Sequence, residues 1–142
     1  MVKEFNSLEE IQKYYDETTN TYEFKENGSY ISLVRFNFDL EVCANIVACD
    51  IVACKIKAHD INANDIKAYD IDAGNIGACD INASDIKACN IKAFDINAWN
   101  IDACDISYWA VCVAYNNIKC KSIKGRRKNS KHFVFDGKLE VE

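Results

Sequence analysis

The most regular feature of the chain is a repeat of one large apolar, one small and one polar position every five residues. Isoleucine occupies every fifth position from Ile46 to Ile106, thirteen times without a gap. Alanine occupies every fifth position from Ala48 to Ala103. The residue before each isoleucine is Asp or Asn, except at Lys55. The repeated unit is therefore (Asp/Asn)-Ile-x-Ala-x, in which x varies.

A period of five fits neither a simple helix nor one long strand. Five helical residues turn the side-chain direction by a net ~140°, so the isoleucines would wind around the whole cylinder. In a strand an odd period sends successive isoleucines to opposite faces. The pattern therefore predicts a chain that turns a corner once per unit and coils on itself, with stacked coils ~4.8 Å apart. Asp and Asn would lie near the corners, where their side chains bond backbone groups.

The variable residue before each Asp or Asn indicates which side chains face inward. This position holds five cysteines, several small residues and four aromatic residues, which are Tyr69, Phe94, Trp99 and Trp109. A narrow coil cannot hold Trp beside Ile without overpacking, so we expect Ile and Ala inside and the variable residue outside. The alternative is that the Cys, Ser and Gly residues mark a semi-buried position. If these four aromatic residues are exposed, they are a candidate partner surface, unless a terminal segment covers them.

The uninterrupted units resemble the pentapeptide-repeat proteins, most strongly over residues 43–107. The resemblance implies an all-β fold, a right-handed quadrilateral β-helix with about four units per coil and three to four coils. The usual unit of the family has Ala directly before Asp or Asn, whereas here a variable residue intervenes, as in Ala63-Asn64-Asp65-Ile66. The variant unit, followed by a basic tail, resembles members from bacteria and their phages.

A coil of 20 residues would place three aspartates on one edge, namely Asp65, Asp85 and Asp105. Neighbouring charges ~5 Å apart repel by only about 1 kcal/mol in water, so such a row is tolerable. The row would serve solubility and corner capping, or it would act as a phosphate-like array of charge.

The N-terminal residues 1–42 are expected to cap the coil. Ser7 and Glu10 have the spacing of a capping box, which predicts a helix over about 7–17. Asn27-Gly28 indicates a turn. Alternating apolar residues then predict a strand over about 31–42, which leads into the first coil.

The β-helix is expected to span residues 43–124, with an irregular last coil. Asn117-Ile118-Lys119-Cys120 matches the unit with Cys in the alanine position. Residues 125–142 are predicted to form a basic loop and a small hairpin around Asp136-Gly137, which closes the C-terminal end.

The 142 residues carry a net charge of -5 that is unevenly distributed. Residues 1–44 and 45–107 each carry -5, and residues 108–142 carry +5. The candidate basic patch consists of Lys119, Lys121, Lys124, Arg126, Arg127, Lys128 and Lys131. It would bind nucleic acid through phosphates, or it would be a solvated loop.

Composition narrows the classes of function. The N-terminus has no apolar segment after Lys3, so we expect a cytoplasmic protein without a membrane contact. Five of the eight cysteines occupy the variable position, and we interpret them as small apolar residues rather than disulfide partners or metal ligands. The two histidines, His59 and His132, lie in no catalytic motif, and no glycine-rich phosphate loop is present. We therefore expect no enzyme activity and no cofactor.

The sequence favours a non-catalytic binding or scaffold protein that contacts another macromolecule. A protein is the expected partner, and a homodimer is one option. The alternative, implied by the resemblance, is a DNA mimic that inhibits a topoisomerase or a nuclease of a defence system. A third hypothesis is direct nucleic-acid binding through the basic segment.

Overall fold

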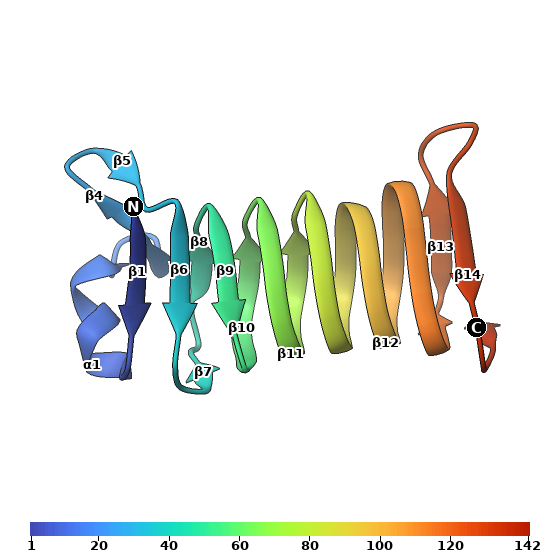
Figure 1. The fold of residues 1–142 in the computed structure, drawn as a ribbon, viewed down its shortest axis with the longest axis horizontal. Coiled ribbons are helices and arrows are strands. Elements are labelled where there is room, and N and C mark those ends of the chain that lie inside the picture. Colours follow the sequence, from blue (N-terminus) through green and yellow to red (C-terminus); the bar gives the residue numbers. More distant parts are fainter.

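The computed structural model describes all 142 residues as a column of stacked strands. Strand accounts for 70% of the chain and helix for 5%, and the parallel strands form a β-solenoid of about six turns. Figure 1 shows the near strands, among them β1 (Val2–Phe5), β6 (Leu33–Phe36) and β9 (Asp50–Ala53), running in one direction while the chain winds as a right-handed coil. The predicted all-β solenoid is confirmed.

Each coil contains three units and fifteen residues. The repeat strands are β8 (Asn45–Val47), β9, β10 (Lys55–Asn62), β11 (Asp65–Gly77) and β12 (Asp80–Cys120). Lys55 of β10 opposes Asp70 of β11, and Asp65 of β11 opposes Asp80 of β12. The quadrilateral coil of 20 residues is therefore wrong, and the coil has three sides. At a spacing of fifteen Lys57 stands beside Asp72, whose charge attracts it, whereas a spacing of 20 would place it beside Gly77.

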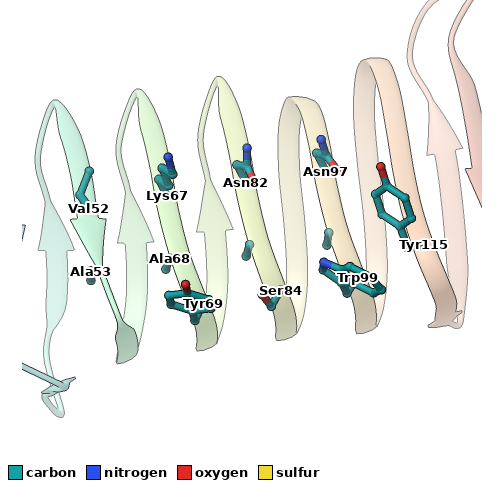
Figure 2. Close-up of a pocket in the computed structure, with 12 residues that line it drawn as sticks. Val52, Ala53, Lys67, Ala68, Tyr69, Asn82, Ser84, Asn97, Trp99 and Tyr115 are labelled. Atoms are coloured by element: carbon teal, nitrogen blue, oxygen red, sulfur yellow. The ribbon is translucent and has the colours of Figure 1, made fainter.

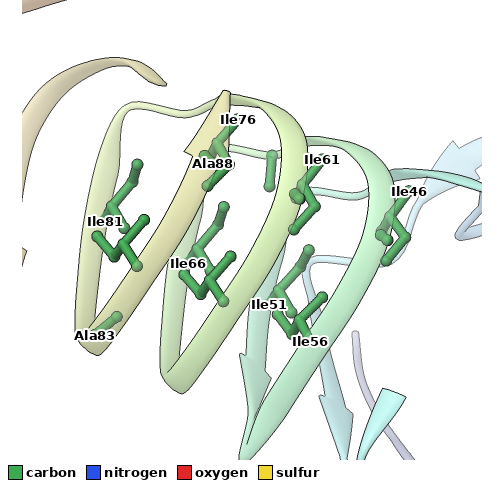
Figure 3. Packing of buried hydrophobic residues seen from close by; sticks show 14 of the residues in the cluster. Ile46, Ile51, Ile56, Ile61, Ile66, Ile76, Ile81, Ala83 and Ala88 are labelled. Carbon is green, nitrogen blue, oxygen red and sulfur yellow. The ribbon is translucent and has the colours of Figure 1, made fainter. Parts of the chain in front are cut away.

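Isoleucine and alanine fill the interior of the coil. All thirteen repeat isoleucines are at most 2% exposed, and ten of the twelve repeat alanines are buried. The other two, Ala68 and Ala78, are partly buried against the same core. Figure 3 shows the isoleucines following one another in rows along the inside of the coil. The expectation that Ile and Ala point inward is confirmed, and the variable residue points outward.

Each of the three sides of the coil carries its own row of isoleucines. The first face carries Ile46, Ile61, Ile76, Ile91 and Ile106. The second face carries Ile51, Ile66, Ile81 and Ile96. The third face carries Ile56, Ile71, Ile86 and Ile101.

Polar side chains at the corners bond from coil to coil. The Asn75 side-chain amide donates to the Asp60 carboxylate at 2.9 Å, and the Asn75 backbone N–H donates to the same oxygen at 2.9 Å. The Asn100 amide likewise donates to Asp85 at 2.7 Å. The Asp and Asn positions therefore stabilise the corners, as predicted from the repeat.

The N-terminal segment combines coil strands with a helical cap. Besides β1 and β6 it contains α1 (Leu8–Ile11), the 3-10 helix η1 (Gln12–Tyr14), β2 (Tyr15–Asp16), β3 (Thr21–Glu23), β4 (Lys25–Glu26), β5 (Ser29–Tyr30) and β7 (Leu40–Glu41). Because β1 pairs with β6 and β6 with β9 in parallel, the stack extends well before residue 43. The predicted strand over 31–42 is divided into β6 and β7.

The helical part is shorter than the predicted 7–17. It ends at Tyr14 because Tyr15 pairs with Tyr22 of β3 instead. Ser7 makes no side-chain cap bond, and the Glu10 carboxylate accepts the backbone N–H of Asn6. The predicted turn is present between β4 and β5, where Asn27 and Gly28 both have positive φ, 50° and 80°.

The C-terminal segment continues the coil, and the predicted hairpin is wrong. The strands β13 (Ser122–Gly125), β14 (Lys131–Val134) and β15 (Leu139–Val141) all pair in parallel with β12. Val134 and Leu139 pack against the core and lie five residues apart, which is the period of the repeat. The Asp136-Gly137 pair therefore lies in the connection between two sides of a coil and does not reverse the chain. No helix in the structure has the length and apolar character needed to cross a membrane.

Candidate ligand-binding face

The predicted acidic edge does not exist in the fifteen-residue coil. Asp65, Asp85 and Asp105 each precede an isoleucine of a different face, so they lie at three different corners. The aspartates that do stack precede the isoleucines of the second face, and they are Asp50, Asp65, Asp80 and Asp95. Partial burial raises the pKa of Asp80, and the carboxylates of Asp65 and Asp95 raise it further.

The seven predicted basic residues are all exposed, but they do not share one environment. Lys119 forms an ion pair with Glu142 at 3.2 Å, and this contact raises the pKa of Lys119. The Arg127 guanidinium lies 5.5 Å from the centre of the Phe94 ring. Arg126, Arg127 and Lys128 lie in the loop between β13 and β14, which protrudes above the C-terminal coils in Figure 1, whereas Lys119 lies on the third face.

The third face carries a row of residues whose charges alternate in sign. The row occupies the position after each isoleucine and consists of Glu41, Lys57, Asp72, Lys87, Asp102, Lys119 and Glu140. Lys57 bonds Glu41 at 3.1 Å, which raises the pKa of the lysine. The face as a whole therefore presents little net charge to a partner.

The predicted aromatic residues divide between two faces. Phe94 and Trp109 lie on the first face with ring centroids 5.6 Å apart. Lys92 lies 5.5 Å from the Trp109 ring, and Arg127 covers Phe94. Trp109 is only half-exposed, so this pair is partly occupied by the protein's own cations.

The aromatic side chains of the second face are more exposed to solvent. Tyr69 is 67% exposed and Trp99 is 51% exposed, and both stand in the variable row. Trp99 stacks on Tyr115 with centroids 5.0 Å apart, and Tyr115 continues to Phe135 at 5.3 Å. Sequence reasoning missed Tyr115 because the coil that follows Ile106 is longer than fifteen residues, as the pairing of Ile106 with Ile123 shows, and this moves Tyr115 out of the five-residue spacing.

The second face is hollowed into a groove of about 410 Å³ that runs along the solenoid axis. Figure 2 shows one wall formed by the row of Val52, Lys67, Asn82 and Asn97, and the opposite wall by Tyr69, Ser84 and Trp99. The floor consists of Ala53, Ala68, Ala83 and Ala98, and Tyr115 lies at the C-terminal end. No Asp or Glu lines the groove.

The polar groups of this groove have no partners in the protein. The side chains of Lys67, Asn82, Ser84 and Asn97 form no hydrogen bond or ion pair, whereas corner residues such as Asn75 and Asn100 do. Their hydrogen-bonding capacity is therefore open to solvent or to a ligand. The sequence contains a signal for this site, because these residues and Tyr69 and Trp99 fall in two rows at a spacing of fifteen.

All eight cysteine thiols are free, and those in the variable position point away from the core. The structure contains no cluster of three or more His, Cys, Asp or Glu side chains arranged to hold a metal ion. Comparison with protein families, with curated proteins and with solved structures finds no match to the chain.

Proposed function

We propose that the protein is a non-catalytic binding protein whose second face holds an extended macromolecular ligand along the solenoid axis. The observation that carries the proposal is the groove in which exposed Tyr69 and Trp99 face polar side chains without partners. Covering aromatic surface stabilises a complex by about 25 cal/mol per Å². Tyr and Trp are the usual anchors of binding surfaces because they are rigid and amphipathic.

Mimicry of DNA has weaker support from the charge pattern. Residues 45–107 carry -5. They span a little more than four coils, or roughly 20 Å, so the repeat carries one net charge per ~4 Å of axis. Duplex DNA carries one per ~1.7 Å. The row of Asp50, Asp65, Asp80 and Asp95 is the one feature that favours mimicry, and the alternating row of the third face opposes it.

Direct nucleic-acid binding through the basic segment also has less support than the groove. Lys119 is paired with Glu142, and Arg127 lies over Phe94, so two of the seven cations already have partners. Phosphate binding needs several cations that reach one backbone together.

The test uses the whole chain immobilised on beads and an extract of the source organism separated into protein, nucleic-acid and polysaccharide pools. We expect the wild-type chain to retain material from one pool, and the double variant Tyr69→Ala/Trp99→Ala to lose it. Phe94→Ala is the matched control, because it removes an exposed aromatic ring from the first face. Unfolding curves of all variants check that they remain folded, as expected for side chains so exposed.

Two outcomes would contradict the proposal. One is that no pool is retained. The other is that the double variant retains the same material as the wild-type chain, because the second face would then make no contribution.

A further inference from the structure

We propose that the ligand of the second face is an uncharged glycan, a chain of β-linked pyranose rings lying along the groove. This inference rests on the proposed function, and it names the chemical class of the ligand. It follows from the spacing of the aromatic rings, the free polar side chains and the distribution of charge.

The spacing of the aromatic residues matches a chain of sugar rings. Tyr69 and Trp99 stand two coils apart, which is ~9.6 Å at the usual distance between strands. A pyranose ring with its linking oxygen is about as long as one coil is high, so successive rings would lie over successive coils. In a β-1,4-linked chain every second ring has the same orientation. Two such rings can therefore place their C–H faces on Tyr69 and Trp99 in the same way.

The side chains around the aromatic rings suit hydroxyl groups. Asn82 and Asn97 each offer an amide that donates and accepts, and the Ser84 hydroxyl does the same. Sugar hydroxyls also donate and accept, so each free group can be satisfied without a charge. Ser84 is small and stands between Tyr69 and Trp99 in their row, which leaves space for the intervening ring (Figure 2).

The charges around the groove favour an uncharged chain over a nucleic acid. Lys67 is the one cation that lines the groove. The row of stacked aspartates, which includes Asp65 and Asp80, lies two residues before the wall of Lys67 and Asn82 on each strand. A polyanion in the groove would pass along these carboxylates and be repelled. Single-stranded nucleic acid needs a positively charged groove beside its stacking platform, and this face does not provide one.

The experiment is isothermal titration of the whole chain with soluble β-1,4-linked oligosaccharides of glucose and of N-acetylglucosamine, two to six rings long. We expect binding by chains of three or more rings and much weaker binding by the disaccharides, because two rings cannot reach both aromatic side chains. Tyr69→Ala and Trp99→Ala should each weaken binding of the hexasaccharides about tenfold. Asn82→Ala should weaken it less, and Phe94→Ala should leave it unchanged.

A glycan array and a fluorescent oligonucleotide complete the test. The inference is overturned if neither the oligosaccharides nor the array binds, or if Tyr69→Ala and Trp99→Ala leave glycan binding unchanged. Salt-sensitive oligonucleotide binding that depends on Tyr69 and Trp99 would also overturn it. If the bead experiment retains protein or nucleic acid through the second face while glycans do not bind, the inference fails and the proposed function stands. If nothing is retained, both fail.

Discussion

Replacing Asp80 by Asn should stabilise the protein, because Asp80 lies in a row of like charges. Its neighbours in adjacent coils are Asp65 and Asp95. Two unit charges ~4.8 Å apart repel by about 0.9 kcal/mol in water, so two neighbours contribute about 1.7 kcal/mol. Salt near physiological strength has a Debye length of ~8 Å and removes roughly half of this. We therefore expect Asp80→Asn to raise the free energy of unfolding by about 1 kcal/mol.

The matched variant is Asp102→Asn, for which the opposite sign is expected. Asp102 is also exposed, but in the row of the third face it stands between Lys87 and Lys119. Asp102 attracts these lysines without a direct ion pair, since Lys119 bonds Glu142, so each attraction lies at the low end of the roughly 0.2–1 kcal/mol of an exposed ion pair. We expect Asp102→Asn to lower the free energy of unfolding by about 0.5 kcal/mol.

The assay is urea unfolding followed by circular dichroism, at low salt, in 1 M NaCl and over a range of pH. High salt should shrink both effects. The pKa of Asp80 is raised in the folded protein, so ionisation of this carboxyl destabilises the fold. That destabilisation is present above the folded pKa and disappears as the pH falls below the ordinary value of 3.8. The gain from Asp80→Asn should therefore be largest near neutral pH and absent in acid.

The signs of the two effects test the register itself. In a coil of 20 residues Asp102 would stand between Asn82 and Ser122, and its removal would have little electrostatic effect. Destabilisation by Asp80→Asn at low salt, or stabilisation by Asp102→Asn, would refute the three-sided arrangement. Equal changes in both variants would show that the substitution itself, and not the row of charge, decides the outcome.

Three further results are expected. Ile76→Ala should lower the free energy of unfolding in urea by about 2–5 kcal/mol, because Ile76 is fully packed in the core, and a loss below 1 kcal/mol would contradict that packing. Asn75→Ala should lower it by about 1 kcal/mol in the same assay through loss of the bond to Asp60, and an unchanged midpoint would show that this corner bond adds nothing. Burial raises the pKa of Cys112 to about 12, so an alkylating reagent followed by mass spectrometry should modify exposed Cys54 in the folded protein and leave Cys112 intact.

The interior of the solenoid was predictable because it depends on local properties alone. A period of five requires a corner in each unit, and the size of Trp99 and Tyr69 keeps the variable position outside a narrow coil. Ile46 to Ile106 and their alanines are buried accordingly. Cys120 also takes the inward place of an alanine, as its position in the last unit predicts.

The number of sides was not predictable from the repeat, because identical units stack equally well in coils of any whole number of units. The information on the number of sides lies in the outer positions whose residues vary from unit to unit. At a spacing of fifteen, Lys57, Asp72, Lys87 and Asp102 alternate in sign. The predicted edge of Asp65, Asp85 and Asp105, by contrast, came from a spacing of 20 that the resemblance implied. The groove was missed for the same reason, since its two walls align only at fifteen.

The outer residues of the repeat differ in whether they contact a neighbouring coil. Because all units have the same interior, a coil with one unit more or fewer would pack its isoleucines equally well, so the outer residues must select the coil length. A coil that is one unit shorter would place Lys57 beside Lys67. A coil that is one unit longer would place Lys57 beside Gly77. The attraction between Lys57 and Asp72 therefore favours three sides. The hydrogen bonds of the corner amides likewise favour three sides. Asn82 and Asn97 bond to no neighbouring coil, so selection of the coil length does not explain them, and they are the amides that the proposed glycan would contact.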